Sequence, residues 1–186
     1  MFKIIIMKEI YWWDSDASEN YWIEITDRED LGENLKAPMY NQSGEEFWSY
    51  SFLKLLKQND IVLHYHKKYK KILGISQVED IYSESQLKWA ARGSFSRRFK
   101  TKPYWRKGWQ VPLKNFRLLE KPIHLESIIK KQEIIKKEYN KLKLVHKTAL
   151  YFPFELSEKR PSRPMQGYLF KFPKFMVKLF PNIISD

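Results

Sequence analysis

The chain has 186 residues, 43% of them hydrophobic and 16% aromatic, which is enough to fill one core and predicts a single domain over residues 1–186. It contains no cysteine, so disulfides and thiolate metal sites are excluded and an intracellular, cytoplasmic setting is expected. The net charge of +12 predicts a polyanionic partner such as nucleic acid or, less often, an anionic membrane, and because no apolar run approaches the roughly 20 residues of a membrane span, a membrane partner would be peripheral.

The first half of the chain alternates apolar and polar residues in the manner of β-strands. Residues 1–16 hold a short apolar run without a small-residue cleavage site, so we expect a strand there and not a signal peptide. Further strands are predicted at Tyr21–Thr26, Ile61–His66, Ile72–Val78 and Trp109–Leu113. The basic sequence KKYKK joins the middle two and indicates a hairpin. Before them, Ser51–Gln58 has apolar residues at helical spacing, with Ser49 or Ser51 as the candidate cap.

Two helices and an aromatic loop are predicted in the last third. Leu125–Leu142 carries an apolar stripe against a lysine-rich face, which is typical of a helix with one solvated side. Lys174–Phe180 is bracketed by prolines and predicts a short buried helix. Between them, we expect a long loop that docks through Tyr151, Phe152, Phe154, Tyr168 and Phe170. The predicted fold class is α+β, with a small closed or strongly bent β-barrel and flanking helices.

One segment, Ser85–Leu119, contains ten Lys/Arg residues and no Asp or Glu, with aromatic residues between the cations. Cations neutralise phosphates and aromatic faces stack on bases, so this mixture suits a nucleic-acid surface. The alternative is a solvated basic loop whose aromatic side chains belong to the core. The residues predicted to contact phosphates, as a group, are Arg92, Arg97, Arg98, Lys100, Lys102, Arg106 and Lys107.

The sequence shows no recognisable catalytic, metal or cofactor site. His64 and His66 lie two apart on a predicted strand, as a zinc pair would, but no third ligand has matching spacing, so ordinary histidines are the favoured interpretation. The phosphate-binding pattern G-x-x-x-x-G-K-[ST] and a G-x-S-x-G turn are absent, and no carboxylate is followed two positions later by lysine. The acidic cluster at 27–33 lacks the calcium-loop pattern. We therefore expect a binding module without a cofactor or metal, and not an enzyme.

The order of several motifs is more specific than any one of them. YWIEIT is followed by TDREDLGENLKAP, FWSYSFLKLLKQNDIVLHY, ILGISQVEDIY, KWAARG, KPYWRKGWQVPL and PFELSEKRPSRPMQGYL. In this order the chain resembles, over nearly its whole length, the EVE/YTH-like (PUA-related) modules. These are N-terminal specificity domains of modification-dependent restriction systems, including McrBC-type GTPases and HNH nucleases.

The resemblance implies a small β-barrel that flips a modified base out of duplex DNA and holds it in an aromatic cage. An attached C-terminal or separate GTPase or nuclease would then perform the cleavage. Matching the family's pattern, Trp48 would form one wall of the cage and Trp105 the other, with Trp89 or Trp109 as substitutes. The alternative for Trp48 is a core anchor for the helix, and Trp109, on a predicted strand, is favoured as core.

The same resemblance assigns the polar edge of the base to the loop after the first strand. Thr26, Asp27 and Asn34 would supply it, with Ser49 beside the wall. The alternative for Asp27 is a cap or a bridge to Arg28.

The leading hypothesis is therefore a monomeric module that reads methylated double-stranded DNA. The resemblance to YTH domains favours methylated adenine, because their cage of aromatic walls rewards an added methyl group, and methylated or hydroxymethylated cytosine is second. An RNA-binding module that reads methylated RNA is the alternative, because the basic and aromatic surface does not choose between the two nucleic acids. A nuclease acting alone is the third class.

Overall fold

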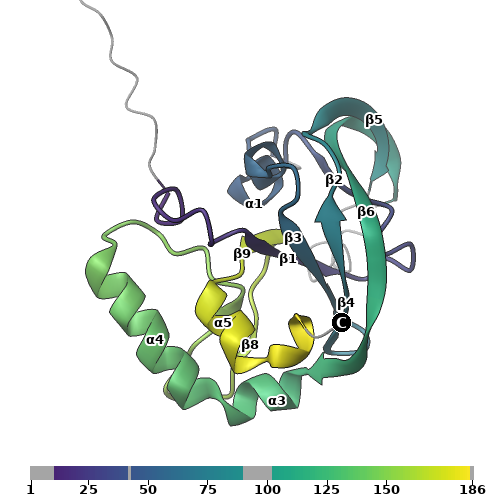
Figure 1. Ribbon diagram of the computed structural model, residues 1–186. Helices are drawn as coiled ribbons and strands as arrows, with labels where there is room; N and C mark the ends of the chain where they lie inside the picture. The colour runs from purple at the N-terminus through teal and green to yellow at the C-terminus, as the bar shows by residue number, and fades with distance from the viewer. Residues whose placement is uncertain (1–10, 42, 90–101, 185–186) are drawn as a thin grey trace, which may run out of the picture.

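A strongly bent sheet of seven strands forms the centre of the molecule (Figure 1). The computed structural model describes residues 11–41, 43–89 and 102–184. Its strands are β1 (Tyr21–Thr26), β2 (Asn34–Pro38), β3 (Ile61–His66), β4 (Lys71–Val78), β5 (Ser83–Trp89), β6 (Tyr104–His124), β7 (Phe154–Glu155), β8 (Arg163–Pro164) and β9 (Leu169–Lys171). The order in the sheet is β2-β6-β4-β3-β1-β9, with β5 paired to β6, while β7 and β8 form a separate pair. β1 and β3 run parallel, and the other described pairs are antiparallel.

The two faces of the sheet bury different hydrophobic clusters, because neighbouring residues of a strand point in opposite directions. On β1, Trp22 belongs to a cluster inside the bend, whereas Ile23 belongs to a cluster on the outer face. On β3, Val62 and Leu63 divide in the same way. The buried residues of these two strands are therefore continuous in sequence, and alternate ones pack in the inner and the outer cluster.

The long strand β6 produces the bend. Its first half pairs with β2 and β5, and its second half pairs with β4. The β4–β6 register shifts between Ile72 and Gly74 and again between Ile75 and Gln77. Such irregularities bend a strand and increase its twist. Opposite them, Asn115 has a positive φ of 53°, which Asn tolerates better than most residues.

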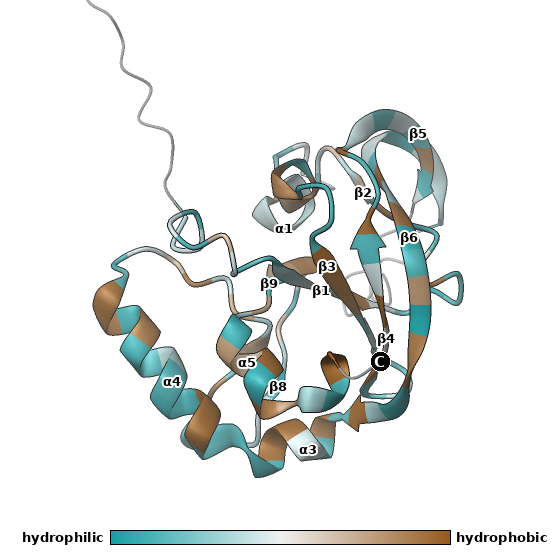
Figure 2. Ribbon diagram, in the orientation of Figure 1, coloured by the Kyte–Doolittle hydropathy of each residue, from teal (hydrophilic) through white to brown (hydrophobic). Residues whose placement is uncertain are grey.

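Short helices cover the bent sheet. They are α1 (Trp48–Ser51), the 3-10 turn η1 (Phe52–Leu55), α3 (Leu125–Lys130), α4 (Gln132–Val145), α5 (Lys174–Leu179) and the 3-10 turn η2 (Pro181–Ile183). Buried residues of η1 belong to the inner cluster, and those of α3, α4, α5 and η2 belong to the outer one. Figure 1 shows α1 near the β5–β6 ribbon, at the opposite end of the molecule from α3. Figure 2 shows that β5 is largely hydrophilic and that β3 is largely hydrophobic.

Most of the predicted elements are confirmed. β1 and β3 match their predicted bounds, β4 begins one residue early, and β3 and β4 form the expected hairpin. α5 ends one residue before the predicted end. Of the five loop aromatics, Phe152, Phe154, Tyr168 and Phe170 are buried and Tyr151 is half-buried. The predicted α+β class with a strongly bent sheet is confirmed. The sheet is open and not a closed barrel, because β2 and β9 lie at the two ends of the strand order and do not pair with each other.

Several boundaries differ from the predictions. The helix expected at 51–58 begins at Trp48 and ends as a 3-10 turn at Leu55, and neither end has a side-chain cap. The long helix expected from Leu125 is interrupted at Lys131, whose φ of −100° and ψ of 7° separate α3 from α4. The strand expected in the opening residues falls partly outside the described residues, and Tyr11–Ser15 lies in turns. Among the described helices, none has the length and apolar character of a membrane span.

Candidate functional site

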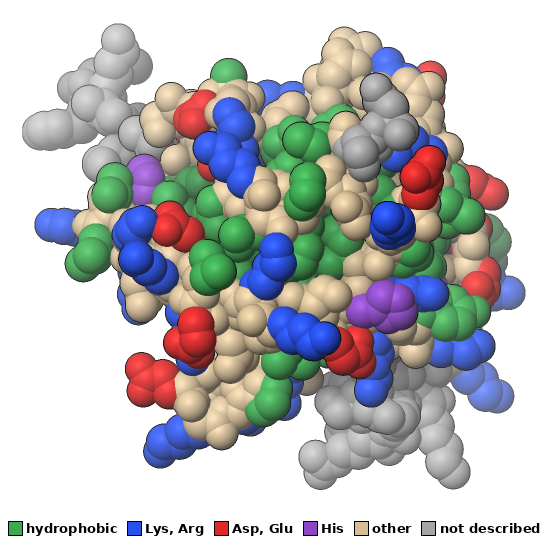
Figure 3. Space-filling view, turned by 60° about the horizontal axis from the view of Figure 1, so that its bottom comes forward, with side chains coloured by type: hydrophobic (Ala, Val, Ile, Leu, Met, Phe, Trp, Pro, Cys, Tyr) green, Lys and Arg blue, Asp and Glu red, His purple; other side chains and the backbone are tan. Residues whose placement is uncertain are grey.

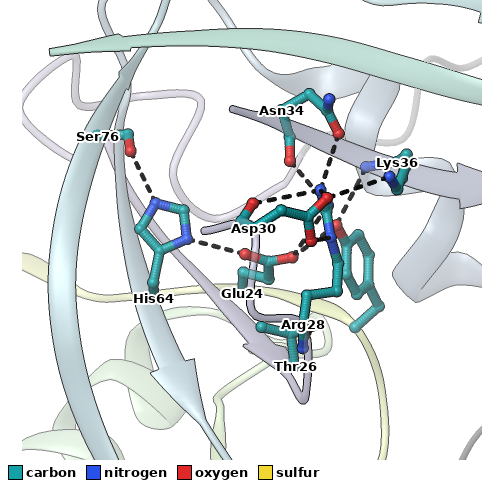
Figure 4. Close-up of polar contacts among 9 residues, drawn as sticks. Glu24, Thr26, Arg28, Asp30, Asn34, Lys36, His64 and Ser76 are labelled. Atoms are coloured by element: carbon teal, nitrogen blue, oxygen red, sulfur yellow. Dashed lines mark hydrogen bonds and ion pairs between the residues drawn. The ribbon is translucent and has the colours of Figure 1, made fainter. Parts of the chain in front are cut away.

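Three buried polar side chains form a row across the inner face of β1, β3 and β4 (Figure 4). His64 Nδ1 lies 2.8 Å from Glu24 Oε2, and His64 Nε2 lies 2.8 Å from Ser76 Oγ. Each of the three residues is 1% exposed or less. Because β1 and β3 pair in parallel with Glu24 opposite His64, both side chains leave the same face at the same level. Strand register therefore creates this row.

The row has the connectivity of a serine, histidine and carboxylate triad, but the fold closes it to substrates. A working triad needs a nucleophile that a substrate can reach. Phe116 packs edge-on against the His64 ring, with centroids 5.6 Å apart. Gly32 and Gly74 leave room for this ring, since a Cβ at either position would lie 2.2 or 2.9 Å from Phe116 atoms. We therefore interpret the row as a brace between three strands.

Arg28 connects this row to the open edge of β2. Its Nη1 donates to the backbone oxygen of Asn34 at 2.8 Å, and its Nη2 donates to Asn34 Oδ1 at 3.1 Å. Nε and Nη2 also donate to the two carboxylate oxygens of Asp30, and Nη1 lies 3.8 Å from Glu24 Oε1. Burial lowers the pKa of Arg28, but the hydrogen bonds that Arg28 donates to Asp30 and the nearby negative charges outweigh burial and raise it. The same guanidinium holds the pKa of Asp30 below its usual range.

The predicted polar edge is occupied by contacts within the protein. Thr26 is buried, and its Oγ1 accepts a hydrogen bond from the backbone N–H of Arg28 at 3.2 Å. Asn34 is held by Arg28, so Thr26 and Asn34 are brought into one network. Asp27 turns away from that network and pairs with Lys67 Nζ at 3.6 Å, and not with Arg28.

Tyr168 joins the buried network to an aromatic cluster. Its hydroxyl donates to Glu24 Oε1 at 2.8 Å and accepts from the backbone N–H of Lys36 at 3.1 Å. Burial and the charge of Glu24 raise the pKa of Tyr168 well above its ordinary value, so the phenol is neutral. The ring of Tyr168 faces the end of β5, where it contacts Trp89 and Tyr50.

The three rings of Tyr50, Trp89 and Tyr168 form what we call the aromatic cluster. Their centroids are 5.9 to 6.5 Å apart, and each pair packs edge to face. Tyr50 and Trp89 are half-buried, so each also presents surface to solvent, whereas Tyr168 is buried. Burial raises the pKa of Tyr50. The cluster is thus a rigid apolar site at the surface, built from α1, β5 and the segment before β9.

Ser49 supports this cluster from α1, and its neighbour Trp48 packs on other rings. The Trp48 ring packs on Phe52, Tyr151 and Phe170, with centroids 5.0 to 5.3 Å apart, and it is half-buried. Ser49 is fully buried, and its Oγ accepts hydrogen bonds from the consecutive backbone N–H groups of Tyr168 and Leu169. Ser49 therefore fixes the position of Tyr168 relative to α1.

Trp105 does not join the cluster. In the β5–β6 pairing it lies opposite Lys88, whereas the next residue of β5, Trp89, lies opposite Tyr104. Since neighbouring residues of a strand point to opposite faces, Trp105 and Trp89 lie on opposite faces of the ribbon. The Trp105 side chain is 68% exposed. Trp109, the other substitute wall, is a buried core residue with Lys54 Nζ 4.6 Å from its ring centroid.

The predicted phosphate contacts have different surroundings. Of the predicted contacts, Lys102 and Lys107 are exposed. Lys88, which is not in the predicted group, is also exposed and lies opposite Trp105. Arg106 is half-buried, and its Nη2 donates to the backbone oxygens of Tyr40 and Asn41 at 2.8 and 3.1 Å. Arg106 thus anchors the ribbon to the loop after β2. The remaining predictions, which lie outside the described residues, are Arg92, Arg97, Arg98 and Lys100.

Charge alone does not locate a binding face. Figure 3 shows lysines and arginines spread over the end of the molecule that carries the helices, with hydrophobic side chains among them. The β5–β6 ribbon differs because its cations adjoin an exposed tryptophan and the aromatic cluster.

The two strand histidines have separate surroundings. His64 is fully used by the buried row, while His66 stacks on Tyr69 with ring centroids 4.4 Å apart. The His66 nitrogens have no hydrogen-bond partner among the described residues, and the nearest carboxylate oxygen, on Glu29, is 3.9 Å from Nε2. Over the part of the chain that the structure describes, no group of three or more His, Asp or Glu residues is arranged to hold a metal.

Sequence reasoning missed Tyr168, Arg28 and Tyr50 as members of the site. Tyr168 was expected only as a docking aromatic, and its partner Glu24 is 144 positions away in the sequence. A sequence signal for Arg28 does exist, because an arginine between acidic residues after a buried strand favours internal pairing.

No family model and no curated protein matches this chain. Among solved structures, the fold is similar to the N-terminal domain of McrB from Staphylothermus marinus, with 14% identity, a TM-score of 0.45, and coverage of 87% of this chain and 93% of that one. It is also similar to human THYN1 solved with DNA containing 5-methylcytosine, with 12% identity, a TM-score of 0.42, and coverage of 89% and 99%.

A third similar structure is a protein from Pseudomonas putida, with 14% identity, a TM-score of 0.44, and coverage of 86% of this chain and 98% of that one. An N-terminal domain of McrB, the kind of module that the sequence resembles, is thus among the similar solved structures. Similarity at this level concerns the arrangement of strands and helices alone.

Proposed function

We propose that this chain is a non-catalytic recognition module that binds double-stranded DNA containing a modified base. The observation that carries the proposal is the position of the aromatic cluster, at the Trp89 end of a ribbon that presents the cations Lys88 and Lys107, with Lys102 just before β6. Cations along the ribbon contact phosphates, and the cluster offers apolar ring surface for a base.

The modified base leaves the helix and packs against the half-buried rings of Trp89 and Tyr50. A base inside a duplex presents only its edges, so contact with its ring faces requires flipping. Tyr168 contacts both rings, and Ser49 fixes the backbone of Tyr168 against α1. These supporting contacts are preorganised in the free protein, which lowers the entropic cost of binding.

Thr26 and Asn34 have a positioning role in this proposal. Both are hydrogen bonded to Arg28, which lies 3.8 Å from the Glu24 carboxylate that accepts the Tyr168 hydroxyl. They therefore act on the base through Tyr168 and do not need to touch it.

We propose N6-methyladenine as the preferred base, with methylated or hydroxymethylated cytosine second. A methyl group adds apolar surface to the base edge, and its transfer from water to a ring-lined site is favourable. Discrimination by one methyl group is limited to about 1–3 kcal/mol. The module would work as a monomer that delivers an attached or separate GTPase or nuclease to the modified site.

The proposal is tested by titrating the protein against duplexes that are identical except for one base, at a fixed salt concentration. We expect wild-type protein to prefer one modified duplex by about tenfold over the unmodified one. Trp89→Ala should abolish this preference and leave weak, salt-dependent binding. Tyr69→Ala, which removes a half-exposed ring at the far turn between β3 and β4, is the matched control and should keep the preference.

Equal binding of modified and unmodified duplexes by the wild-type protein would reject the proposal. A methylated single-stranded RNA included in the same titration tests the RNA alternative. Preference for that RNA over every duplex would assign the site to RNA.

A further inference from the structure

Trp105 is the exception among the tryptophans of this chain. Trp12, Trp13, Trp22 and Trp109 are 1–6% exposed, and Trp48 and Trp89 are half-buried, whereas Trp105 is 68% exposed. A large aromatic side chain gains more than almost any other from burial, so an exposed tryptophan is a candidate for contact with a partner where its neighbours also suit one.

The surroundings of Trp105 point to a nucleic acid as that partner. Lys88 lies directly opposite it on β5, and Lys107 lies two residues further along the same face of β6. Both lysines are exposed. An indole ring between two free ammonium groups matches a base stack bordered by phosphates.

The ribbon holds Trp105 on a rigid support. β5 and β6 pair over seven consecutive residues without a register shift. Arg106 ties the ribbon to the backbone oxygens of Tyr40 and Asn41, and the backbone N–H of Met39 donates to the oxygen of Lys107 at 3.2 Å. At Gly108, a Cβ would lie 2.2 Å from Leu87, so the strands are tightly packed there. A side chain that must enter a base stack needs such support.

We propose that Trp105 is a wedge that enters the DNA base stack and fills the gap left by the flipped base. The inference rests on the proposed function and gives Trp105 a different role from the cage wall expected from the sequence. One ribbon then serves both parts of the flipping reaction. Trp89, on one face, receives the base, and Trp105, on the other face, takes its place in the helix.

A wedge contributes to binding only where a paired base stack has a gap to fill, so its effect should differ between duplex and single-stranded DNA. The test measures affinity for a modified duplex and for the modified strand alone. It compares the wild-type protein with Trp105→Ala and Trp89→Ala. Trp105→Ala should weaken duplex binding by about tenfold and single-strand binding by less than about twofold, because a single strand leaves no gap in a paired stack. Trp89→Ala should weaken both to a similar extent, because the base occupies its site in either case.

A second duplex identifies the step directly. With 2-aminopurine beside the target base, unstacking raises its fluorescence, and Trp105→Ala should lower that signal relative to wild type. A duplex with an abasic nucleotide opposite the target should restore most of the lost affinity, since less pairing has to be broken. Tyr104→Ala removes the other exposed ring of the ribbon, 51% exposed on the opposite face, and should leave the duplex-to-single-strand ratio unchanged.

Equal losses on duplex and single strand would overturn the wedge and return Trp105 to the base site. No loss on either would also overturn it and assign the exposed ring to another partner. These outcomes are separate from failure of the proposed function, which is read from wild-type protein on modified against unmodified DNA. The wedge is read from the ratio of duplex to single-strand binding.

Discussion

The interior of the bent sheet and the β5–β6 ribbon use the same residue types in opposite ways. Inside, Arg28 is 6% exposed and has hydrogen bonds to Asp30 and Asn34. On the ribbon, Lys88 and Lys107 are exposed beside an exposed ring. A buried cation is tolerated only with partners in the fold, whereas an exposed cation remains available for an external phosphate. The number of basic residues in a sequence therefore does not measure the size of its binding surface.

The aromatic residues divide in the same manner. Trp22 donates from its Nε1 to Asp60 Oδ2 at 2.8 Å and lies 4.2 Å from the Lys171 ammonium, so both its polar and its ring surfaces are used inside the protein. Trp105 shows most of its ring to solvent. The candidate binding residues of this chain are therefore those whose charged groups or ring surfaces have no partner within the described structure.

The largest effect that would sharpen this contrast is expected from Arg28→Ala. Removing the guanidinium leaves Glu24 buried without its nearest cation, and we expect the free energy of unfolding to fall by about 3–5 kcal/mol. Urea unfolding followed by tryptophan fluorescence measures the change. Lys88→Ala is the ribbon control and should change stability by less than about 0.5 kcal/mol. Similar losses in both variants would erase the distinction between the two regions.

The next effect concerns Lys171, which is 1% exposed and donates a hydrogen bond to the backbone oxygen of Glu19. Burial lowers its pKa from 10.5 to about 8. Between these values the unfolded chain binds the proton and the folded chain does not, so the free energy of unfolding should rise with pH, by up to about 1.4 kcal/mol per pH unit. Lys171→Met should lack this rise between pH 8 and 9.5, and Lys178→Met, an exposed control on α5, should retain it. An unchanged slope in Lys171→Met would contradict the assignment.

Replacing Lys88 and Lys107 together by glutamine tests the ribbon without disturbing the core. Each phosphate contact contributes about 0.9 to the slope of log affinity against log salt, so the slope should fall by about 1.8. Unfolding should change by less than about 0.5 kcal/mol. The control is the exposed pair Lys137 and Lys143 of α4, whose replacement should leave the slope unchanged. If the α4 pair changes the slope equally, DNA binding is not localised to the ribbon.

The smallest effect is expected from Asp27→Asn. Asp27 pairs with Lys67 at 3.6 Å across a partly solvated surface, and such pairs contribute about 0–1 kcal/mol. We expect stability to change by less than about 0.5 kcal/mol and the preference for modified DNA to be retained. A variant that keeps its stability but loses that preference would place Asp27 at the edge of the bound base.

The sequence predicted those strands and helices whose own residues show an apolar pattern. β4 was predicted because its alternation of apolar and polar residues matches its alternating burial. β1 and β3 were predicted because they are rich in apolar and aromatic residues, although both of their faces are buried. β5 was not predicted, because six of its seven residues are not buried and its strand conformation comes from pairing with β6. β2 and β9 are short and likewise depend on their neighbours.

The candidate site was predictable in composition but not in geometry. Ser49 and Trp89 contact Tyr168 from distant parts of the chain, and Trp48 packs on the nearby Phe170. The face on which Trp105 points depends on a register that no local pattern reports, because a shift by one residue reverses every side chain of a strand. Tyr168 depends on contacts with residues more than a hundred positions away.

The free edge of β2 has a consequence for how this protein behaves in concentrated solution. An unpaired strand edge is a template on which a second chain can add a strand and begin to aggregate. Here the backbone oxygen of Asn34 already accepts from Arg28, and the backbone N–H of Lys36 already donates to Tyr168. At these two positions the groups that would recruit another chain are occupied by the protein's own side chains, so the contacts that brace the interior also protect against self-association.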